Sequence, residues 1–437
     1  MNTDLIDNTP APEIAGVIIP WTKPSDRPSP NRLSETRGLV EALGCTPAFL
    51  RAEHIRKPSP ANLLSGGLLD RLAEDAEANH CSIIVIDSAL SPIQQRNLET
   101  RLGVKVIDRT GLILEIFGLR ALTKEGKLQV ELARLLYERS RLVRTWTHLE
   151  RQRGGRGFLG GPGETQLESD KRMIDQKVGR LHRDLDAVIR TRDVQRAGRR
   201  RDGKPIIALI GYTNSGKSTL FNRLSGANVL AQDMPFATLD PTIRKLELPS
   251  LGEAALVDTV GFITDLPTHL IDSFRATLEE TLDADLLIHV RDRSSEEDEA
   301  QKRDVLSVMQ RLSEQSDQDI PPIIEAWNKI DLLSDFVRDT LAASPSDETD
   351  IPGVAVSALT GAGIAELLEA IEAELSAGRR TYQFNAPASD GALRAWLHQH
   401  VVVETETFDE NGETQYSVNM SAKQLGQLKA AFPKLLT

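Results

Sequence analysis

The sequence predicts a multidomain α/β protein, and three patterns in its 437 residues support this fold class. Short apolar runs alternate with helical runs in two separate regions, as in sheets with mainly parallel strands. One apolar run is followed by the glycine-rich pattern of a phosphate-binding loop. Between the two regions, helical runs with apolar residues every three or four positions flank a glycine-rich stretch.

Residues 16–125 are predicted to form an N-terminal α/β domain after a disordered tail at residues 1–15. Strand-like runs occur as "GVIIP", "CSIIVIDSAL" and "VKVIDRT", whereas "LSETRGLVEALGCT" and "SPIQQRNLETRLG" have helical spacing. The Pro- and Ser-rich run "RKPSPANLLSGG" is expected to be a loop. Strands alternating with helices predict a small sheet with parallel strands.

Residues 126–200 are predicted to form a long antiparallel helical hairpin whose tip is "RGGRGFLGGPGETQ". Heptad-spaced apolar residues on both sides carry this prediction, with Arg139 and Lys171 as polar interruptions. Thr165 and Glu168 form a capping box that is expected to start the second helix. The alternative is two separate helices packed on neighbouring domains. The heptad residues are Leu128, Leu132, Leu135, Leu142, Trp146, Leu149, Leu167, Ile174, Val178, Leu181, Leu185 and Val188.

Residues 204–380 are predicted to form a nucleotide-binding α/β domain with a mainly parallel sheet. Its strand-like runs are "KPIIALIG", "AALVDTVG", "ADLLIHVRD", "PPIIEAWNK" and "GVAVSA". Residues 381–437 combine helical runs with two strand-like runs around "DENGET", which predicts a small C-terminal α+β domain. No chemistry is assigned to this last domain.

The run "GYTNSGKS" at residues 211–218 lies between a predicted strand and a predicted helix. In that context the backbone N–H groups of the loop and the helix N-terminus bind phosphate oxygens. Lys217 is expected to reach the β- and γ-phosphates, and Ser218 to supply a hydroxyl ligand to Mg²⁺. Gly211 and Gly216 are expected to allow the close approach of the backbone.

The run "DTVGF" at residues 258–262 follows the next strand-like run of this domain. Asp258 is expected to bind Mg²⁺ through water, and the N–H of Gly261 to contact the γ-phosphate. The run "FATLDPT" at residues 236–242 is expected to supply the switch threonine that completes the Mg²⁺ shell. Thr238 is preferred for that role, and Thr242 is the alternative.

The runs "NKID" at residues 328–331 and "SAL" at residues 357–359 predict specificity for guanine. The carboxylate of Asp331 can accept hydrogen bonds from guanine N1–H and N2–H₂, a donor pair that adenine lacks. Asn328 and Lys329 are expected to brace the loop and cover the base, and backbone N–H groups of "SAL" to contact O6. Four motifs in this order predict a GTP hydrolase.

These motifs define the predicted site. The predicted catalytic residues are Lys217, Thr238 and Gly261, and the predicted metal ligands are Ser218, Thr238 and, through water, Asp258. The predicted nucleotide pocket comprises Gly211, Tyr212, Thr213, Asn214, Ser215, Gly216, Lys217, Ser218, Thr219, Phe236, Ala237, Thr238, Leu239, Asp240, Asp258, Thr259, Val260, Gly261, Asn328, Lys329, Ile330, Asp331, Ser357, Ala358 and Leu359.

Two positions in the motifs bear on the rate of hydrolysis. Phe262 stands where a glutamine of Ras-type switches orients the attacking water, and a phenylalanine ring cannot do so. Asn214 is the fourth residue of the phosphate loop, where an asparagine in some related GTPases helps to hold a potassium ion. The alternative is that Asn214 only hydrogen-bonds the loop. The expected cofactor is Mg²⁺, held by the ligands named above, and a role for K⁺ beside the phosphates stays open.

The net charge of −12 disfavours nucleic-acid binding by the whole surface, but the charge is uneven. Residues 151–201 hold 14 lysines and arginines against 7 acids. Within them, the run from 191 onwards is expected to be an exposed basic linker, either an RNA contact or a solvated spacer.

Three features of the sequence favour a cytoplasmic protein: two isolated cysteines, no apolar run of 18 residues and a polar N-terminal segment. Peripheral association with a membrane stays open.

The chain resembles the HflX family of bacterial translation-factor-like GTPases over roughly residues 90–375. The resemblance is carried by "GYTNSGKSTLFN", "FATLDPT", "DTVGF" and "NKID", preceded by "VIDRTGLILEIF", "EGKLQVELARLLY" and "GGRGFLGGPGETQLESDKR". The last of these is the most specific. At residues 51–70 the resemblance is weaker, because "LLSGGLLDRL" replaces the family's Tyr-Ile-Gly-Lys-Gly type of loop.

The resemblance implies a factor that binds the large ribosomal subunit and, with GTP bound, separates stalled or idle ribosomes into subunits. It implies that the glycine loop reaches toward the peptidyl transferase centre, and that ATP is accepted as well as GTP. Cationic side chains and an aromatic ring in and beside the loop suit contact with RNA. The residues predicted to contact RNA are Arg151, Arg153, Arg156 and Phe158.

The sequence leaves competing functions open. A ribosome-splitting GTPase that acts as a monomer is favoured. The second hypothesis is a GTP-regulated RNA-binding factor that acts as a large-subunit assembly or hibernation checkpoint without splitting. An RNA-unwinding ATPase is less favoured, because "NKID" selects guanine. For the glycine stretch alone, a flexible connector with solvated charges is the alternative.

Overall fold

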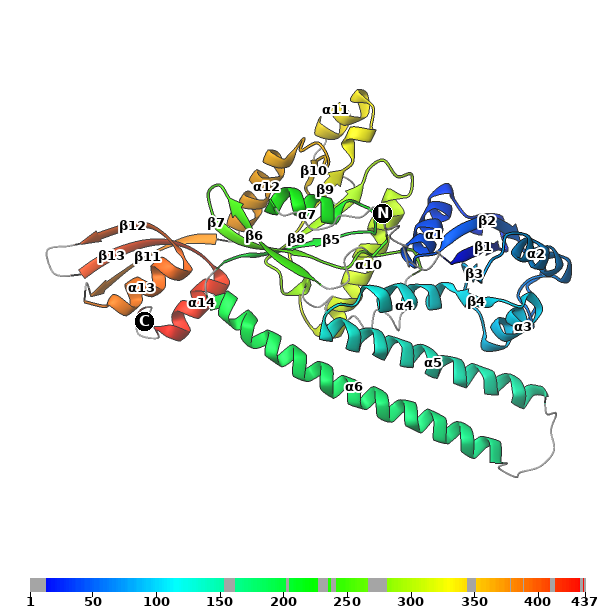
Figure 1. Ribbon diagram of the computed structural model, residues 1–437. Coiled ribbons are helices and arrows are strands. Elements are labelled where there is room, and N and C mark those ends of the chain that lie inside the picture. Colours follow the sequence, from blue (N-terminus) through cyan, green and yellow to red (C-terminus); the bar gives the residue numbers. More distant parts are fainter. Residues whose placement is uncertain are drawn as a thin grey trace, which may run out of the picture. The chain divides into compact units, whose positions relative to one another are not determined.

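The computed structural model describes residues 13–152, 162–201, 204–226, 235–236, 241–265, 281–343, 351–377, 379–387, 389–408, 413–432 and 435. The chain divides into two compact units, whose elements are labelled in Figure 1. Unit 1 comprises residues 1–185, 232–240 and 265–274, and unit 2 comprises residues 186–231, 241–264 and 275–437. Among the described residues, every helix is too short or too polar to span a bilayer.

Unit 1 contains a four-stranded parallel sheet in the order β2-β1-β3-β4, which confirms the predicted N-terminal α/β fold. Its strands are β1 (Ile14–Trp21), β2 (Thr46–His54), β3 (Ile83–Ile86) and β4 (Lys105–Asp108). Its helices are η1 (Pro24–Asp26), α1 (Pro30–Ala42), α2 (Gly66–Ala78), α3 (Pro92–Leu102) and α4 (Arg109–Arg120). The sequence analysis did not predict β2, α2 or α4.

Local sequence explains where α3 begins and ends. The hydroxyl of Ser91 accepts a hydrogen bond from the N–H of Gln94, whose side chain accepts one from the N–H of Ser91. This reciprocal capping satisfies two N–H groups of the first turn. Gly103 ends the helix with a φ of 69°, a conformation that glycine adopts at little cost.

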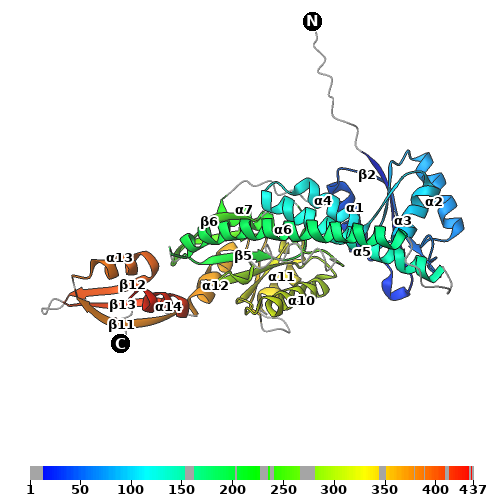
Figure 2. The same cartoon turned by 90° about the horizontal axis from the view of Figure 1, so that it is seen from below.

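The helices α5 (Lys124–Gln152) and α6 (Pro162–Arg201) run side by side, as the heptad pattern predicts (Figures 1 and 2). Four leucines, two from each helix, form a buried cluster between them: Leu132, Leu135, Leu181 and Leu185. The guanidinium of Arg139, one of the predicted interruptions, pairs with Asp175 of α6 at 2.8 Å. The seam is therefore apolar, with an ion pair at its polar position.

Two details of the predicted hairpin are wrong. The helix α6 begins at Pro162, ahead of Thr165, so the Thr165–Glu168 box lies inside the helix and does not cap it. Proline's fixed φ suits the first helical turn, which accounts for the earlier start. The run from residue 191, expected as a linker, continues α6 as far as Arg201. It is rich in arginine, which favours helix.

Unit 2 contains a six-stranded sheet in the order β10-β9-β8-β5-β7-β6. All its pairs are parallel except β6 with β7, which confirms the predicted mainly parallel sheet. Its strands are β5 (Ile206–Ile210), β6 (Thr242–Leu248), β7 (Gly252–Asp258), β8 (Leu286–Asp292), β9 (Ile323–Asn328) and β10 (Gly353–Ala355). Its helices are α7 (Lys217–Ser225), α10 (Asp298–Ser316), η2 (Ile330–Leu332), α11 (Asp335–Ala343) and α12 (Ile364–Ala377).

The last part of unit 2 is a three-stranded antiparallel sheet in the order β11-β13-β12, which confirms the predicted α+β fold. The strands are β11 (Arg379–Pro387), β12 (Val402–Phe408) and β13 (Glu413–Ser421), and the helices are α13 (Gly391–His400) and α14 (Ala422–Ala431). One face of the sheet packs Phe384, Tyr416 and Val418 against Leu393 and Leu397 of α13. The strand β11 was not predicted.

Candidate nucleotide-binding site

The phosphate loop follows β5 and leads directly into α7. Two of its glycines have backbone angles that disfavour side chains, with φ of 144° at Gly211 and 95° at Gly216. Space also demands glycine there. A Cβ on Gly211 would lie 2.3 Å from the carbonyl oxygen of Val290, and one on Gly216 would lie 2.1 Å from Nδ2 of Asn328. The loop is therefore wedged between β8 and the "NKID" motif.

The ammonium group of Lys217 folds back over this loop. Its Nζ donates hydrogen bonds to the carbonyl oxygens of Gly211 at 3.0 Å and Tyr212 at 2.5 Å. Burial lowers the pKa of Lys217 to about 8, and the negative charge of Asp258 opposes that shift. The amine is thus held against the phosphate loop by two backbone carbonyls.

Two oxygen donors lie together where a phosphate-bound metal ion is expected. The hydroxyl of Ser218 donates to Oδ2 of Asp258 at 3.0 Å, and the Asp258 side chain is buried. A hydroxyl and a carboxylate are the oxygen ligands that Mg²⁺ prefers, so the donor set fits the predicted metal. Thr238 lies outside the described residues. Thr242 begins β6 and pairs in register with Asp258 of β7.

The "DTVGF" segment is bonded to the phosphate loop through its backbone. The N–H of Thr213 donates to the carbonyl of Phe262 at 2.6 Å, and the N–H of Phe262 donates to the carbonyl of Gly211 at 3.0 Å. These bonds hold Gly261 so close that a Cβ there would lie 2.8 Å from Nζ of Lys217. The ring of Phe262 is buried, so it contributes packing and no contact with water.

The guanine motif connects three loops. The side-chain amide of Asn328 donates to the carbonyl of Ser215 at 2.8 Å, and its oxygen accepts from the N–H of Ala358 at 2.9 Å. The hydroxyl of Ser357 donates to Oδ1 of Asp331 at 2.5 Å and so orients the carboxylate predicted to select guanine. The predicted residues of "GYTNSGKS", "NKID" and "SAL" are therefore brought together.

Three contacts at this site were not predicted. Asp292 pairs with Nζ of Lys329 at 2.8 Å, and Lys329 has a φ of 64°. The hydroxyl of Tyr212 donates to Asp304 of α10 at 2.8 Å. Arg223 of α7 bonds the carbonyls of the "SAL" loop. The partner residues Asp292, Asp304 and Arg223 belong to no spaced motif. Only the parallel register of β8 and β9 could have suggested the first contact, because it places Asp292 opposite Asn328.

Part of the predicted site belongs to unit 1 or is not described. Phe236 belongs to unit 1, where its ring packs edge-on against Phe117 with centroids 4.6 Å apart. The residues Ala237, Thr238, Leu239 and Asp240 lie outside the described residues, as do Arg153, Arg156 and Phe158. Arg151 is in the last turn of α5, and its side chain is not described. The RNA contacts therefore stay predictions.

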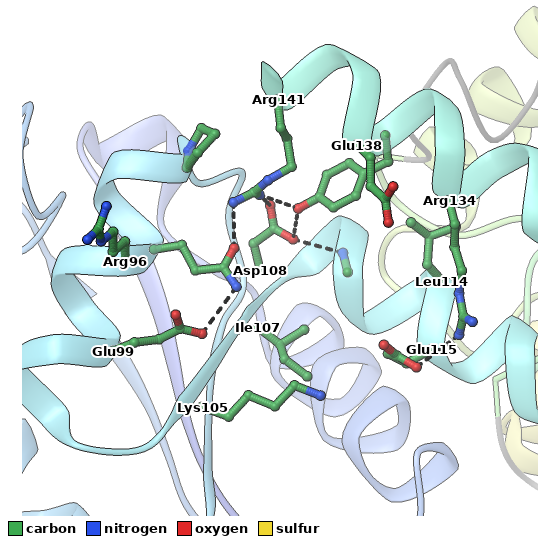
Figure 3. A pocket seen from close by; sticks show the side chains of 14 residues that line it. Arg96, Glu99, Lys105, Ile107, Asp108, Leu114, Glu115, Arg134, Glu138 and Arg141 are labelled. Atoms are coloured by element: carbon green, nitrogen blue, oxygen red, sulfur yellow. Dashed lines mark hydrogen bonds and ion pairs between the residues drawn. The ribbon is translucent and has the colours of Figure 1, made fainter. Parts of the chain in front are cut away.

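Unit 1 also contains a cavity of about 530 Å³, walled by β4, α3, α4 and α5 (Figure 3). Asp108 lies in its wall and accepts hydrogen bonds from Tyr137 Oη at 2.7 Å and from the N–H of Gly111 at 2.8 Å. Burial, with the charge of Asp108, raises the pKa of Tyr137. Arg141 donates to Tyr137 Oη and to Gln95 Oε1. These polar groups hydrogen-bond one another and so join β4, α3, α4 and α5.

Comparison with known families matches four segments of the chain. Residues 30–118 match the family described as GTP-binding GTPase N-terminal, and residues 120–199 match GTP-binding GTPase Middle Region. Residues 206–329 match the family described as 50S ribosome-binding GTPase, and residues 345–433 match HflX C-terminal domain.

Individual relatives match over most of their length. The GTPase HflX of Magnetococcus marinus is 44% identical over 377 residues, which are 86% of this chain and 84% of the relative. The GTPase HflX of Escherichia coli strain K12 is 42% identical over 389 residues, 89% of each chain. A crystal structure of a GTP-binding protein from Sulfolobus solfataricus in complex with GDP is 24% identical with a TM-score of 0.47, covering 84% of this chain and 99% of that one.

Proposed function

The chain belongs to the HflX family of GTPases, and from that premise we propose that it binds the large ribosomal subunit and, with GTP bound, separates stalled or idle ribosomes into subunits. It is a P-loop GTP hydrolase. Action as a monomer in the cytoplasm is part of the proposal.

One observation carries the proposal: a guanine-nucleotide site occurs in the same chain as a long helical arm. The helix α5 has 29 residues and α6 has 40, and a leucine seam joins them. At 1.5 Å per residue, α5 alone is about 40 Å long. Such an arm can carry the basic glycine-rich segment between the two helices into a folded RNA, where backbone N–H groups and arginines bind phosphates.

The nucleotide is proposed to control the arm through the switch segments. The γ-phosphate orders such segments when GTP binds, and hydrolysis releases them. Here Gly261 lies beside Lys217, the residue expected to reach the γ-phosphate, since a Cβ on Gly261 would be 2.8 Å from Nζ of that lysine. GTP is therefore expected to favour productive docking on the ribosome, and hydrolysis to favour release.

The roles of the pocket residues follow from their contacts. Lys217 supplies positive charge to the β- and γ-phosphates, and the loop N–H groups hold the same oxygens. Ser218 and Asp258 are the residues that would hold Mg²⁺, which neutralises phosphate charge when bound. Asp331, oriented by Ser357, accepts hydrogen bonds from the guanine N1–H and N2–H₂.

The attacking water needs a partner other than Phe262, because that ring is buried. We propose that the ribosome supplies the missing orientation and that K⁺ contributes to it. Asn214 is exposed on the phosphate loop with a φ of 59°, and its side chain makes no hydrogen bond within the described residues. Its amide oxygen is therefore available to a cation beside the phosphates.

Sedimentation of intact ribosomes tests the proposal. With the protein and a non-hydrolysable GTP analogue, free subunits should appear, and the Lys217→Ala variant should leave the ribosomes intact. Unchanged particles with the protein bound would contradict splitting and support the second candidate, a large-subunit assembly or hibernation checkpoint.

A further inference from the structure

Arg223 lies in the last turn of α7, the helix that begins with Lys217. Its Nε donates to the carbonyl oxygen of Ala358 at 3.2 Å, and its Nη2 donates to the carbonyl oxygen of Leu359 at 2.5 Å. One side chain therefore donates hydrogen bonds to two consecutive carbonyl groups of the "SAL" loop. The helix α7 thus has the phosphate-binding Lys217 at its N-terminal end and Arg223 in its last turn.

The hydrogen bond from Arg223 to the carbonyl of Ala358 also orients the N–H of Leu359. The carbonyl of Ala358 and the N–H of Leu359 belong to one planar unit, in which they point in opposite directions. Fixing the carbonyl toward Arg223 therefore aims the N–H of Leu359 to the other side of the loop. A cationic partner on the carbonyl also strengthens the N–H as a donor, because hydrogen bonds in a chain polarise one another.

The loop offers few other donors. The N–H of Ala358 donates to Asn328, and the N–H of Thr360 donates to the hydroxyl of Ser357. Across the described part of the chain, the N–H of Leu359 donates to no protein group. It is therefore the donor of this loop that remains for a ligand. Asp331, the residue predicted to bind guanine N1–H and N2–H₂ beside O6, is bonded to the same loop.

The turn after Leu359 lies beside the guanidinium of Arg223. Gly361 has a φ of 91°, and a Cβ built there would lie 3.8 Å from Nη1 and Cζ of Arg223. Its N–H donates to the carbonyl of Ser357 at 2.8 Å, which closes the turn. The closed turn leaves the carbonyls of 358 and 359 on the side that Arg223 occupies.

We propose that Arg223 is the positioning residue for recognition of guanine O6: it aims and polarises the N–H of Leu359, which donates to O6. This inference rests on the guanine pocket assigned above. Adenine carries an amino group in place of O6 and cannot accept this hydrogen bond. The contact therefore adds selectivity at position 6 of the base to the selectivity of Asp331 at positions 1 and 2.

Three nucleotide ligands test the contact at guanine O6 separately from the contact at the 2-amino group. GDP carries the full guanine edge, 6-thio-GDP replaces only O6 by a larger and weaker acceptor, and IDP lacks only the 2-amino group. Dissociation constants of the full-length protein for each are measured by titration calorimetry. The matched control is Arg303→Met, because Arg303 on α10 is also exposed and also donates from Nε to a backbone carbonyl, that of Glu299.

For Arg223→Met, GDP affinity should fall about tenfold, the effect of one hydrogen bond in the pocket. The preference for GDP over 6-thio-GDP should fall toward one, while the preference for GDP over IDP should match the wild type. Arg223→Lys, with fewer donors, should give an intermediate preference. Arg303→Met should leave all three constants unchanged.

The outcomes distinguish failure of this inference from failure of the pocket. If Arg223→Met keeps the wild-type preference for GDP over 6-thio-GDP, the positioning role is overturned while the pocket stands. An equal loss for all three nucleotides would show a merely structural role and also overturn it. If the wild type binds no GDP, the pocket itself is wrong and this inference fails with it.

Discussion

The side-chain amide of Asn328 donates a 2.8 Å hydrogen bond to the carbonyl of Ser215, which joins the guanine motif directly to the phosphate loop. The oxygen of the same amide accepts from the N–H of Ala358 at 2.9 Å. One buried side chain thus joins the base-binding and phosphate-binding loops.

Replacing Asn328 by alanine should lower GDP affinity by about tenfold or more, because two hydrogen bonds of about 1 kcal/mol each are lost. Titration calorimetry measures the effect. Asn97→Ala is the matched control, since Asn97 in unit 1 also donates to a backbone carbonyl, that of Ala61. GDP binding by Asn328→Ala at wild-type strength would contradict the cross-link.

GDP affinity should fall as the pH rises above about 8. The buried amine of Lys217 has its pKa lowered to about 8, so the free protein loses this positive charge well below the pH at which an exposed lysine would. Phosphate binding favours the charged amine, so each further pH unit weakens binding by up to about tenfold until the pKa of the complex is reached.

The control for this pH dependence is the Lys217→Ala variant, which should bind GDP weakly with little change between pH 7 and pH 9.5. A wild-type affinity that stays constant over the same range would show that Lys217 keeps its ordinary pKa. It would also remove the link between the burial of the amine and phosphate binding.

Much of this fold could be predicted because local patterns determine it. The buried strand "IIVI" and the capped helix after Ser91 have the structure that their residues favour. The strands β2, β6 and β11 were missed, because each is short of continuous apolar residues and depends on pairing with a neighbour. Tertiary contacts decide such strands, and one sequence does not contain them.

The candidate site shows the same division. The residues of the spaced motifs "GYTNSGKS" and "NKID" were predictable, because phosphate and guanine chemistry fixes their order. Arg223, Asp292 and Asp304 were not, since each acts on a neighbouring loop through a contact that only folding creates. The sequence shows that Phe262 replaces a glutamine, but it does not show that the ring of Phe262 is buried.

Hydrolysis should be faster in potassium than in sodium at equal ionic strength if Asn214 helps to hold a cation. We expect a several-fold ratio for the wild type and a ratio near one for Asn214→Ala, measured as phosphate release with saturating GTP. Equal wild-type rates in the two salts would remove the potassium proposal and leave Asn214 as a loop residue.

Replacing Arg153 and Arg156 together by alanine should weaken binding to the large subunit and leave basal GTP hydrolysis intact. Affinity falls as the salt concentration rises, and each lost phosphate contact makes the slope of log affinity against log salt less steep by about one. The matched control replaces Arg303 and Arg311, two exposed arginines of α10, and should bind like the wild type. A collapse of basal hydrolysis in the arm variant would place the arm in the active site.

Co-sedimentation with purified large subunits tests most directly whether the guanine pocket controls binding of the arm to ribosomal RNA. The protein should sediment with the subunit when a non-hydrolysable GTP analogue is present, and much less with GDP or with no nucleotide. Equal binding under all three conditions, or no binding under any, would contradict that control.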